Sequence, residues 1–171
     1  MQNRCLAGGT GFLWLLCMFQ YQHILLASHG TPGAQAAERA VLALAAPGAR
    51  ITQLVVVPDF WKGMMGDDWL NNASTRDIYG KHVENQLARE IDAELARMQA
   101  QAQAAGVRHE NRVVLGKPAE CLLECAAQVH PDLVLIGSPR PPGVKGLRSR
   151  MQPETLVRGL RAPLLVVPYP V

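Results

Sequence analysis

The sequence predicts an α/β fold: a single doubly wound, five-stranded parallel sheet with helices on both faces. Three observations lead to this prediction. Short runs rich in Val, Leu and Ile alternate with longer segments of helical periodicity, and Gly or Pro separates them. The 171 residues suffice for one domain with a sizeable core. Hydrophobic residues make up 49% of the chain and aromatic residues only 5%, a mixture that suits helices packed on a sheet.

The first elements form a strand–helix–strand unit. The run HILLASH, residues 23–29, predicts a buried strand. Residues 31–45 predict a helix with Thr31 as its N-cap and Pro32 in its first turn. The segment APGAR breaks this helix, and ITQLVVV, residues 51–57, predicts a second strand that is covered on both faces.

A long connection and a long helix follow. The connection, residues 58–77, carries two of the three tryptophans, and connections of this length are usually functional or flexible. Apolar residues recur every three or four positions over 79–102 and predict a helix. We expect Ser74 or Thr75 to cap this helix and Gly106 to end it.

The rest of the chain continues the alternation. Strands are expected at RVVL, DLVLIG and LLVVP, and helices at KPAECLLECAAQV and PETLVRGL. The three strands are residues 112–115, 132–137 and 164–168, and the two helices are residues 117–129 and 153–160. Right-handed crossovers then give one parallel sheet, with the last strand at its edge.

Charge and cysteine content exclude several classes of protein. The 17 basic and 14 acidic residues give a net charge of +3, too small an excess to indicate nucleic-acid binding. The four cysteines form no disulfide framework and are typical of a reducing compartment. Cys121 and Cys125 share one helix face, where we interpret them as small hydrophobic side chains.

The N-terminal residues 1–17 are expected to lie outside the fold. The apolar stretch over 13–19 is too short to span a membrane, and no clear signal-peptide cleavage site follows it. Met18 stands within five residues of the first strand, so we favour it as the true start, with a signal or anchor as the alternative. These features predict a cytoplasmic protein that does not bind membranes.

Three ordered segments resemble the universal stress protein family across residues 22–168. They are ILLASHGTPGAQAAERAVLALA, GKPAECLLECAAQVHPDLVLIGS and LVRGLRAPLLVV. The resemblance implies the Rossmann-like fold of the adenine nucleotide alpha hydrolases, with residues 18–171 as one universal stress protein domain. It also implies a homodimer related by a two-fold axis and built through the C-terminal strand, residues 163–168.

The family's nucleotide-binding members share a motif of Gly-x-x-Gly, nine residues, then Gly-Ser/Thr, whose backbone amides surround the phosphates. Counted from Gly137, which keeps Ser138 beside it, the second glycine position holds Arg140. The later glycine and hydroxyl positions hold Arg150 and Met151. A second Gly-x-x-Gly begins at Gly143, but no Gly-Ser/Thr follows it at the required spacing.

The first strand departs from the family pattern as well. Nucleotide-binding members carry an aspartate just before the Gly-Ser turn, where this chain has His29 after Ser28. A neutral imidazole offers one donor and one acceptor, so a nucleoside contact stays open while the carboxylate is lost. By resemblance the altered ligand pocket comprises Ser28, His29, Gly30, Val57, Asp59, Gly137, Ser138, Arg140, Gly143, Arg150 and Met151.

The motif changes lead to a functional expectation. The chain is expected to be a non-catalytic regulatory or binding protein of the stress response, without a cofactor, that does not bind ATP in the family's usual way. The alternative is an ATP- or nucleotide-binding member with an altered site. The basic loop over residues 140–150 is interpreted as solvated, with an anion or an acidic partner as the alternative.

Metal chemistry finds little support. His29 at a strand end is similar to the metal-binding histidine of small sirohydrochlorin-type chelatases. That site needs a second histidine at a facing strand end, and neither His109 nor His130 has such a place. The adjacent acids Asp67 and Asp68 are expected to be solvated. We therefore expect no metal site.

Overall fold

A computed structural model describes residues 20–28, 30–57, 73–145 and 151–170; residues 1–17 and most of the tryptophan-bearing connection lie outside this part. The elements follow one another in the order β1 (Tyr21–Ala27), α2 (Pro32–Leu44), β2 (Ala45–Val57), α4 (Ala73–Ala104), β3 (Arg108–Leu115), α5 (Pro118–Val129), β4 (Leu133–Gly137), α6 (Pro153–Gly159) and β5 (Leu164–Val167).

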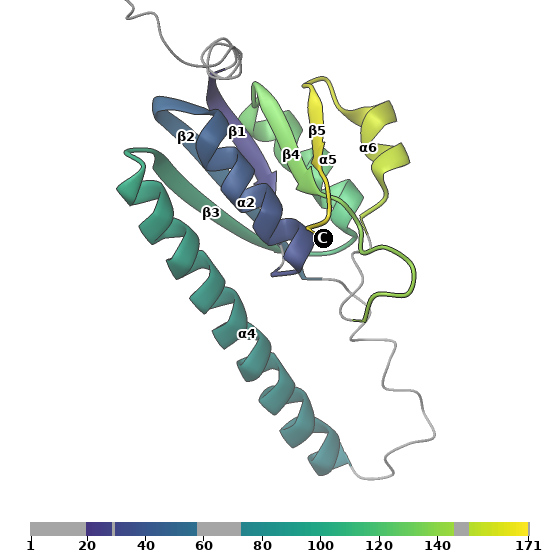
Figure 1. Cartoon of the computed structure of the whole chain (residues 1–171). Helices are drawn as coiled ribbons and strands as arrows, with labels where there is room; N and C mark the ends of the chain where they lie inside the picture. The colour runs from purple at the N-terminus through teal and green to yellow at the C-terminus, as the bar shows by residue number, and fades with distance from the viewer. Residues whose placement is uncertain (1–19, 29, 58–72, 146–150, 171) are drawn as a thin grey trace, which may run out of the picture.

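The five strands form one parallel sheet in the order β3-β2-β1-β4-β5. Helices α2 and α4 cover one face of it, and α5 and α6 cover the other (Figure 1). The predicted α/β fold is confirmed, and so is the place of the last strand at a sheet edge. The strand order reverses between β1 and β4, which makes their carboxyl ends the usual ligand-binding position of such a sheet.

Two hydrophobic cores lie on either side of the sheet because successive side chains of a strand point to opposite faces. On β1, Ile24 and Leu26 pack with α2 and α4, whereas Leu25 and Ala27 pack with α5 and α6. All four are buried, which explains why β1 is an unbroken apolar run.

Three strands begin earlier than the sequence indicated, and β1 does so by two residues, at Tyr21. Segment APGAR is not a loop between α2 and β2. Strand β2 starts at Ala45, directly after α2, and includes this segment. The β1–β2 register shifts between the pairs Tyr21–Ala45 and His23–Arg50, so the intervening residues bulge, with Gly48 at φ 73°. Strand β3 starts four residues before the predicted 112, where its polar residues form an exposed edge.

The predicted cap is found at the start of α2 but not at the start of α4. The Thr31 side chain accepts a hydrogen bond from Ala34 N–H at 3.3 Å, as predicted for the start of α2. The caps proposed for the long helix are wrong, because α4 begins at Ala73 and already includes Ser74 and Thr75. Gly106 follows the end of α4, as predicted.

Within the described residues, no helix combines the length and apolar character that crossing a membrane requires. In the same part of the chain no group of three or more His, Cys, Asp or Glu side chains is arranged to hold a metal ion. Cys121 is half-buried and Cys125 is buried, and neither takes part in a disulfide.

Candidate functional site

The candidate site lies where β1 and β4 end side by side. Ser28 follows β1, Gly137 is the last residue of β4, and Ser138 comes next. The β1–β4 pairing runs in register up to Ala27 and Ile136, so the two strand ends meet at the same level. The structure thus brings together the first-strand and fourth-strand parts of the predicted pocket.

Gly137 is in close contact with the first turn of α2. A Cβ atom at Gly137 would overlap the Gly33 carbonyl and lie 2.7 Å from Ala34 N, and one at Gly33 would lie 2.5 Å from the Ser138 carbonyl oxygen. Neither position has room for a side chain. Glycine is therefore required at the end of β4 by the packing of the chain on itself, whatever the loop binds.

The backbone of Ser138 is also used within the chain. Its N–H donates to the carbonyl oxygen of Val167 at 2.7 Å, and its hydroxyl donates to the Pro139 carbonyl at 3.2 Å. The first of these bonds holds the start of the loop against β5. The Ser138 amide is thereby committed to the sheet and does not point to an open phosphate site.

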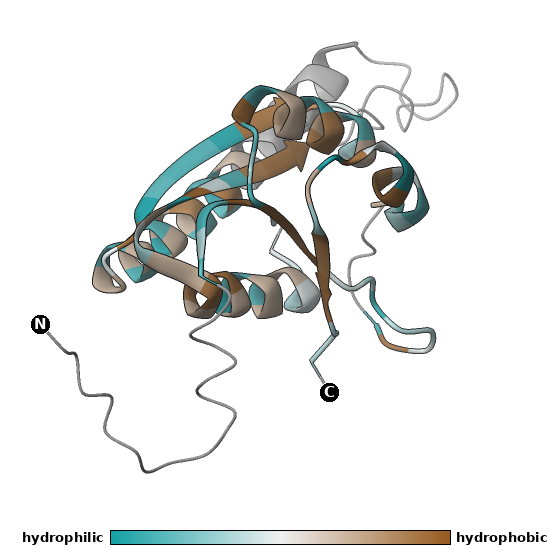
Figure 2. Cartoon of the chain, turned by 90° about the horizontal axis from the view of Figure 1, so that it is seen from above, coloured by the Kyte–Doolittle hydropathy of each residue, from teal (hydrophilic) through white to brown (hydrophobic). Residues whose placement is uncertain are grey.

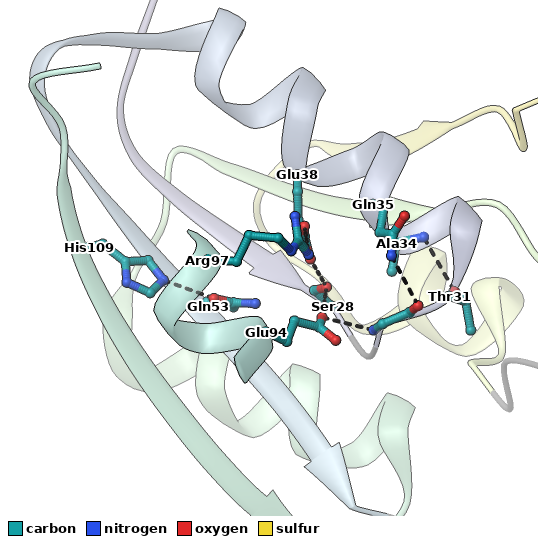
Figure 3. Close-up of polar contacts among 10 residues, drawn as sticks. Ser28, Thr31, Ala34, Gln35, Glu38, Gln53, Glu94, Arg97 and His109 are labelled. Atoms are coloured by element: carbon teal, nitrogen blue, oxygen red, sulfur yellow. Dashed lines mark hydrogen bonds and ion pairs between the residues drawn. The ribbon is translucent and has the colours of Figure 1, made fainter. Parts of the chain in front are cut away.

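A buried polar cluster occupies the carboxyl end of β1 (Figure 3). The Ser28 hydroxyl lies within hydrogen-bond reach of Glu38 Oε1 and 2.8 Å from Glu94 Oε1. The backbone N–H of Gly30 donates to the same Glu94 oxygen at 2.8 Å. Arg97 Nη2 donates to Glu38 Oε2 at 2.5 Å. We call Ser28, Gly30, Glu38, Glu94 and Arg97 the carboxylate cluster.

Burial sets the electrostatics of this cluster. Glu38 is fully buried, and Arg97 is its ion-pair partner. Burial raises the pKa of Glu94, and the nearby charge of Glu38 raises it further, while its hydrogen bonds with Ser28 and Gly30 act in the opposite direction. Gly30 adopts φ 74°, and a Cβ there would lie 2.5 Å from Glu94 Oε2, so the turn and the carboxylate fit each other.

A second polar group extends the cluster toward β3. His109 Nε2 lies 2.8 Å from Gln53 Oε1, and His109 Nδ1 lies 2.7 Å from Gln99 Oε1. Gln53 is fully buried, and its Nε2 has no hydrogen-bond partner among the described residues. Burial lowers the pKa of His109, while the charge of Glu38 acts to raise it.

Comparison with known proteins gives the family. The model of the Universal stress protein family matches residues 20–168. The chain belongs to the universal stress protein family. No curated protein sequence matches it significantly.

Solved structures of universal stress proteins share this fold. A universal stress protein from Burkholderia pseudomallei is 27% identical, with a TM-score of 0.61 over 86% of this chain and 96% of that one. A universal stress protein in complex with cAMP is 23% identical, with a TM-score of 0.54 over 88% of this chain and 99% of that one. An Arabidopsis thaliana family member with AMP bound is 14% identical, with a TM-score of 0.57 over 88% and 93% of the two chains.

Several predicted site residues of this universal stress protein have identifiable places in the structure. Met151 is half-buried and packs on the core beneath α5 and α6. Val57 ends β2, and its carbonyl accepts the N–H of Gly116 at 2.9 Å. Gly143 has φ 84° in an exposed turn. Arg140 is half-buried, with its Nε unpartnered in the described part of the chain.

Three of the predicted residues, His29, Asp59 and Arg150, lie outside the described residues. Of the carboxylate cluster, only Ser28 and Gly30 were predicted from the sequence. One signal was available: Glu38 falls on the same helical stripe as Ala34, Ala37 and Val41, all of which are buried. A charge on the apolar face of a helix indicates a buried partner.

Proposed function

We propose that this universal stress protein is a non-catalytic regulatory or binding protein of the stress response that does not hold ATP in the family's usual manner. The observation that carries the proposal is the contact between Gly137 and Gly33. The one glycine retained from the nucleotide-binding motif lies against the first turn of α2. Its neighbour Ser138 donates its amide to β5. The Ser138 amide is thus used within the chain instead of facing a phosphate, and the glycine at 137 has a packing reason of its own.

The other end of the site supports the same proposal. The Gly30 N–H donates to Glu94. Gly30 follows the carboxyl end of β1, where ligands bind in this kind of sheet. Met151, in the motif's hydroxyl position, contributes apolar packing. An ATP molecule would have to displace an internal carboxylate at one strand end and find few free amides at the other.

The second candidate function is binding of an adenine nucleotide through side chains. Two of the structurally similar universal stress proteins hold AMP or cAMP. In this chain the half-buried Arg140 and the exposed Lys145 follow β4 and supply cations in place of amides. Exposed cations give weak, salt-sensitive attraction. The same two side chains suit an anion or an acidic partner.

The chain is further proposed to act in the cytoplasm as a homodimer joined through residues 163–168. Cys121 and Cys125 are not joined in disulfides, which fits a reducing compartment. Strand β5 forms a sheet edge on which Leu165 and Val166 are exposed, and an apolar edge favours pairing with a second chain.

Isothermal titration with Mg-ATP tests the proposed function. We expect no binding tighter than about 100 µM, on the scale where about 1 µM corresponds to −8.2 kcal/mol. Two or three lost hydrogen bonds to a charged phosphate, each worth about 1.5–3 kcal/mol, account for such weakness. Mass spectrometry of small molecules released from the denatured protein is the companion measurement. A low-micromolar dissociation constant, or a co-purifying adenine nucleotide, would establish the second candidate instead.

A further inference from the structure

In the carboxylate cluster, one hydroxyl group lies against two carboxylate oxygens and can donate to only one of them. The Ser28 hydroxyl has one proton to donate, yet its oxygen lies within hydrogen-bond reach of one carboxylate oxygen from Glu38 and one from Glu94. An ionised carboxylate only accepts hydrogen bonds. One of these two contacts therefore requires a proton on a carboxyl group, because Ser28 cannot donate to both.

The arginine decides which carboxyl group carries that proton. Arg97 Nη2 donates to Glu38 Oε2 at 2.5 Å, and Glu38 is fully buried, where an ionised carboxylate needs a charged partner. Glu38 is thus the ionised member. Arg97 is the only cation bonded to either carboxylate among the described residues, and two like charges in one site favour protonation of one of them. The proton belongs to Glu94.

We propose that Glu94 carries the one proton of the Glu38–Glu94 pair, and that this proton holds α4 on the turn between β1 and α2. The Glu94 hydroxyl donates to Ser28 Oγ, and the Ser28 hydroxyl donates to Glu38, whose second oxygen accepts from Arg97. The Gly30 N–H donates to Glu94 Oε1 at 2.8 Å. The arrangement gives each of these donors one acceptor, and it joins β1, the turn, α2 and α4 (Figure 3).

Loss of the Glu94 proton changes the balance of charge. Glu38 on α2 then faces an ionised Glu94 on α4, with Arg97 bonded to Glu38 and one Ser28 hydroxyl between the two carboxylates. On β3, His109 faces Glu38, but burial lowers its pKa and leaves it uncharged as the pH rises. The carboxylates repel each other, and α4 loosens from α2. Helix α4 is held against α2 in acid and loosens from it as the pH rises.

The sign of the pH dependence follows from Glu94. Burial raises its pKa above the ordinary 4.5, so the folded chain holds the proton more tightly than the unfolded chain does. The resulting stabilisation is complete below pH 4.5 and is lost as the pH rises through the raised value.

Infrared spectroscopy of the full chain detects the proton directly, because a protonated carboxyl group has a carbonyl band that a carboxylate lacks. We expect one step in the loss of this band to have its midpoint above pH 4.5, and we expect Glu94→Gln to remove that late transition. The matched control is Asp92→Asn, an exposed carboxylate of the same helix, which should retain it. If every carboxyl group of the unmodified protein ionises with a midpoint at or below pH 4.5, the proposal is wrong. It is also wrong if Glu94→Gln keeps the late transition.

Thermal unfolding of the same variants measures the consequence for α4. A glutamine at this position keeps the size of the protonated glutamate and can donate to Ser28 through its amide nitrogen, but it cannot ionise. The melting temperature of Glu94→Gln should match that of the unmodified chain in acid and exceed it increasingly as the pH rises. Asp92→Asn should show no such widening difference. A difference between Glu94→Gln and the unmodified chain that stays constant over the whole pH range would overturn the proposal.

Discussion

His23 shows how neighbouring side chains fix the protonation state of a single residue. Arg50 Nη2 lies 2.9 Å from His23 Nδ1, and the Thr52 hydroxyl oxygen lies 2.9 Å from His23 Nε2. A guanidinium group only donates, so Nδ1 must accept and the ring proton sits on Nε2, which donates to Thr52. Burial and the charge of Arg50 lower the pKa of His23, while Asp132 and Glu110 act to raise it.

Acidification should therefore destabilise the amino end of the sheet. A histidine with a lowered pKa stabilises the fold above its ordinary value of 6.5, and this contribution is lost as the pH falls below that value. We expect the free energy of unfolding, measured in urea, to fall from pH 6.5 downward, and to fall less steeply in His23→Gln. His109 shifts in the same direction, so His109→Gln serves as the parallel variant. Equal slopes for His23→Gln and the unmodified protein would contradict the assignment.

Gly137 provides a steric test at the same scale. Replacing it with alanine places a Cβ where the backbone of Gly33 and Ala34 already lies, and backbone atoms cannot move aside as a flexible side chain can. We expect Gly137→Ala to lower the free energy of unfolding by about 1–3 kcal/mol, the usual cost of overpacking. Ser138→Ala, which removes only a half-exposed hydroxyl, should cost much less. Similar stabilities for the two variants would show that the β4–α2 contact yields easily.

The ends of elements depend on a few specific residues, and the end of α4 is an example. The Val107 N–H donates to the Ala102 carbonyl at 2.9 Å, and the Gly106 N–H donates to the Gln103 carbonyl at 3.1 Å. These two bonds are the Schellman arrangement, and it places Gly106 at φ 68°. Gly106 also accepts from Gly48 N–H at 3.3 Å, so the helix end is joined to the bulge in β2.

Substitution of Gly106 isolates the backbone contribution, because no atom lies within 4 Å of a Cβ built there. We expect Gly106→Ala to lower the free energy of unfolding by about 1–2 kcal/mol, the cost of a left-handed conformation for an ordinary residue. Gly106→Asn is the matched control, since asparagine tolerates this conformation and should cost less. Thermal unfolding ranks the three proteins. An alanine variant as stable as the asparagine variant would contradict a conformational origin.

How far the sequence could predict these elements depends on the range of the interactions that form them. Thr31 and Gly106 act within one turn of a helix, and both were predicted correctly. The start of β2 at Ala45 was not, because it depends on pairing with Tyr21. The carboxylate cluster is harder still to predict from the sequence. Ser28 and Glu94 are 66 residues apart and come into contact only when α4 packs on the sheet.

At the scale of the whole molecule, the two edges of the sheet differ. Strand β3 carries charged residues along its exposed edge, whereas the four residues of β5 are all apolar. Figure 2 shows the strand that leads to the C terminus in brown, the colour of hydrophobic residues. Leu165 and Val166 are 38% and 39% exposed on this strand. A chain with this edge open to solvent would be prone to strand pairing, and a dimer partner would cover it.

The homodimer can be tested by placing a charge on this edge. Lysine on an edge strand opposes pairing, because its ammonium group would have to lose water in an apolar interface. We expect Val166→Lys to reduce the mass measured by light scattering from that of two chains to that of one. Val157→Lys is the control, since Val157 is 70% exposed but lies on α6 and not on the edge strand. Proline at 163 and at 168 limits the pairing to the short strand between them, so one substitution should suffice. An unchanged dimer mass for Val166→Lys, with the variant folded, would place the interface elsewhere on the molecule.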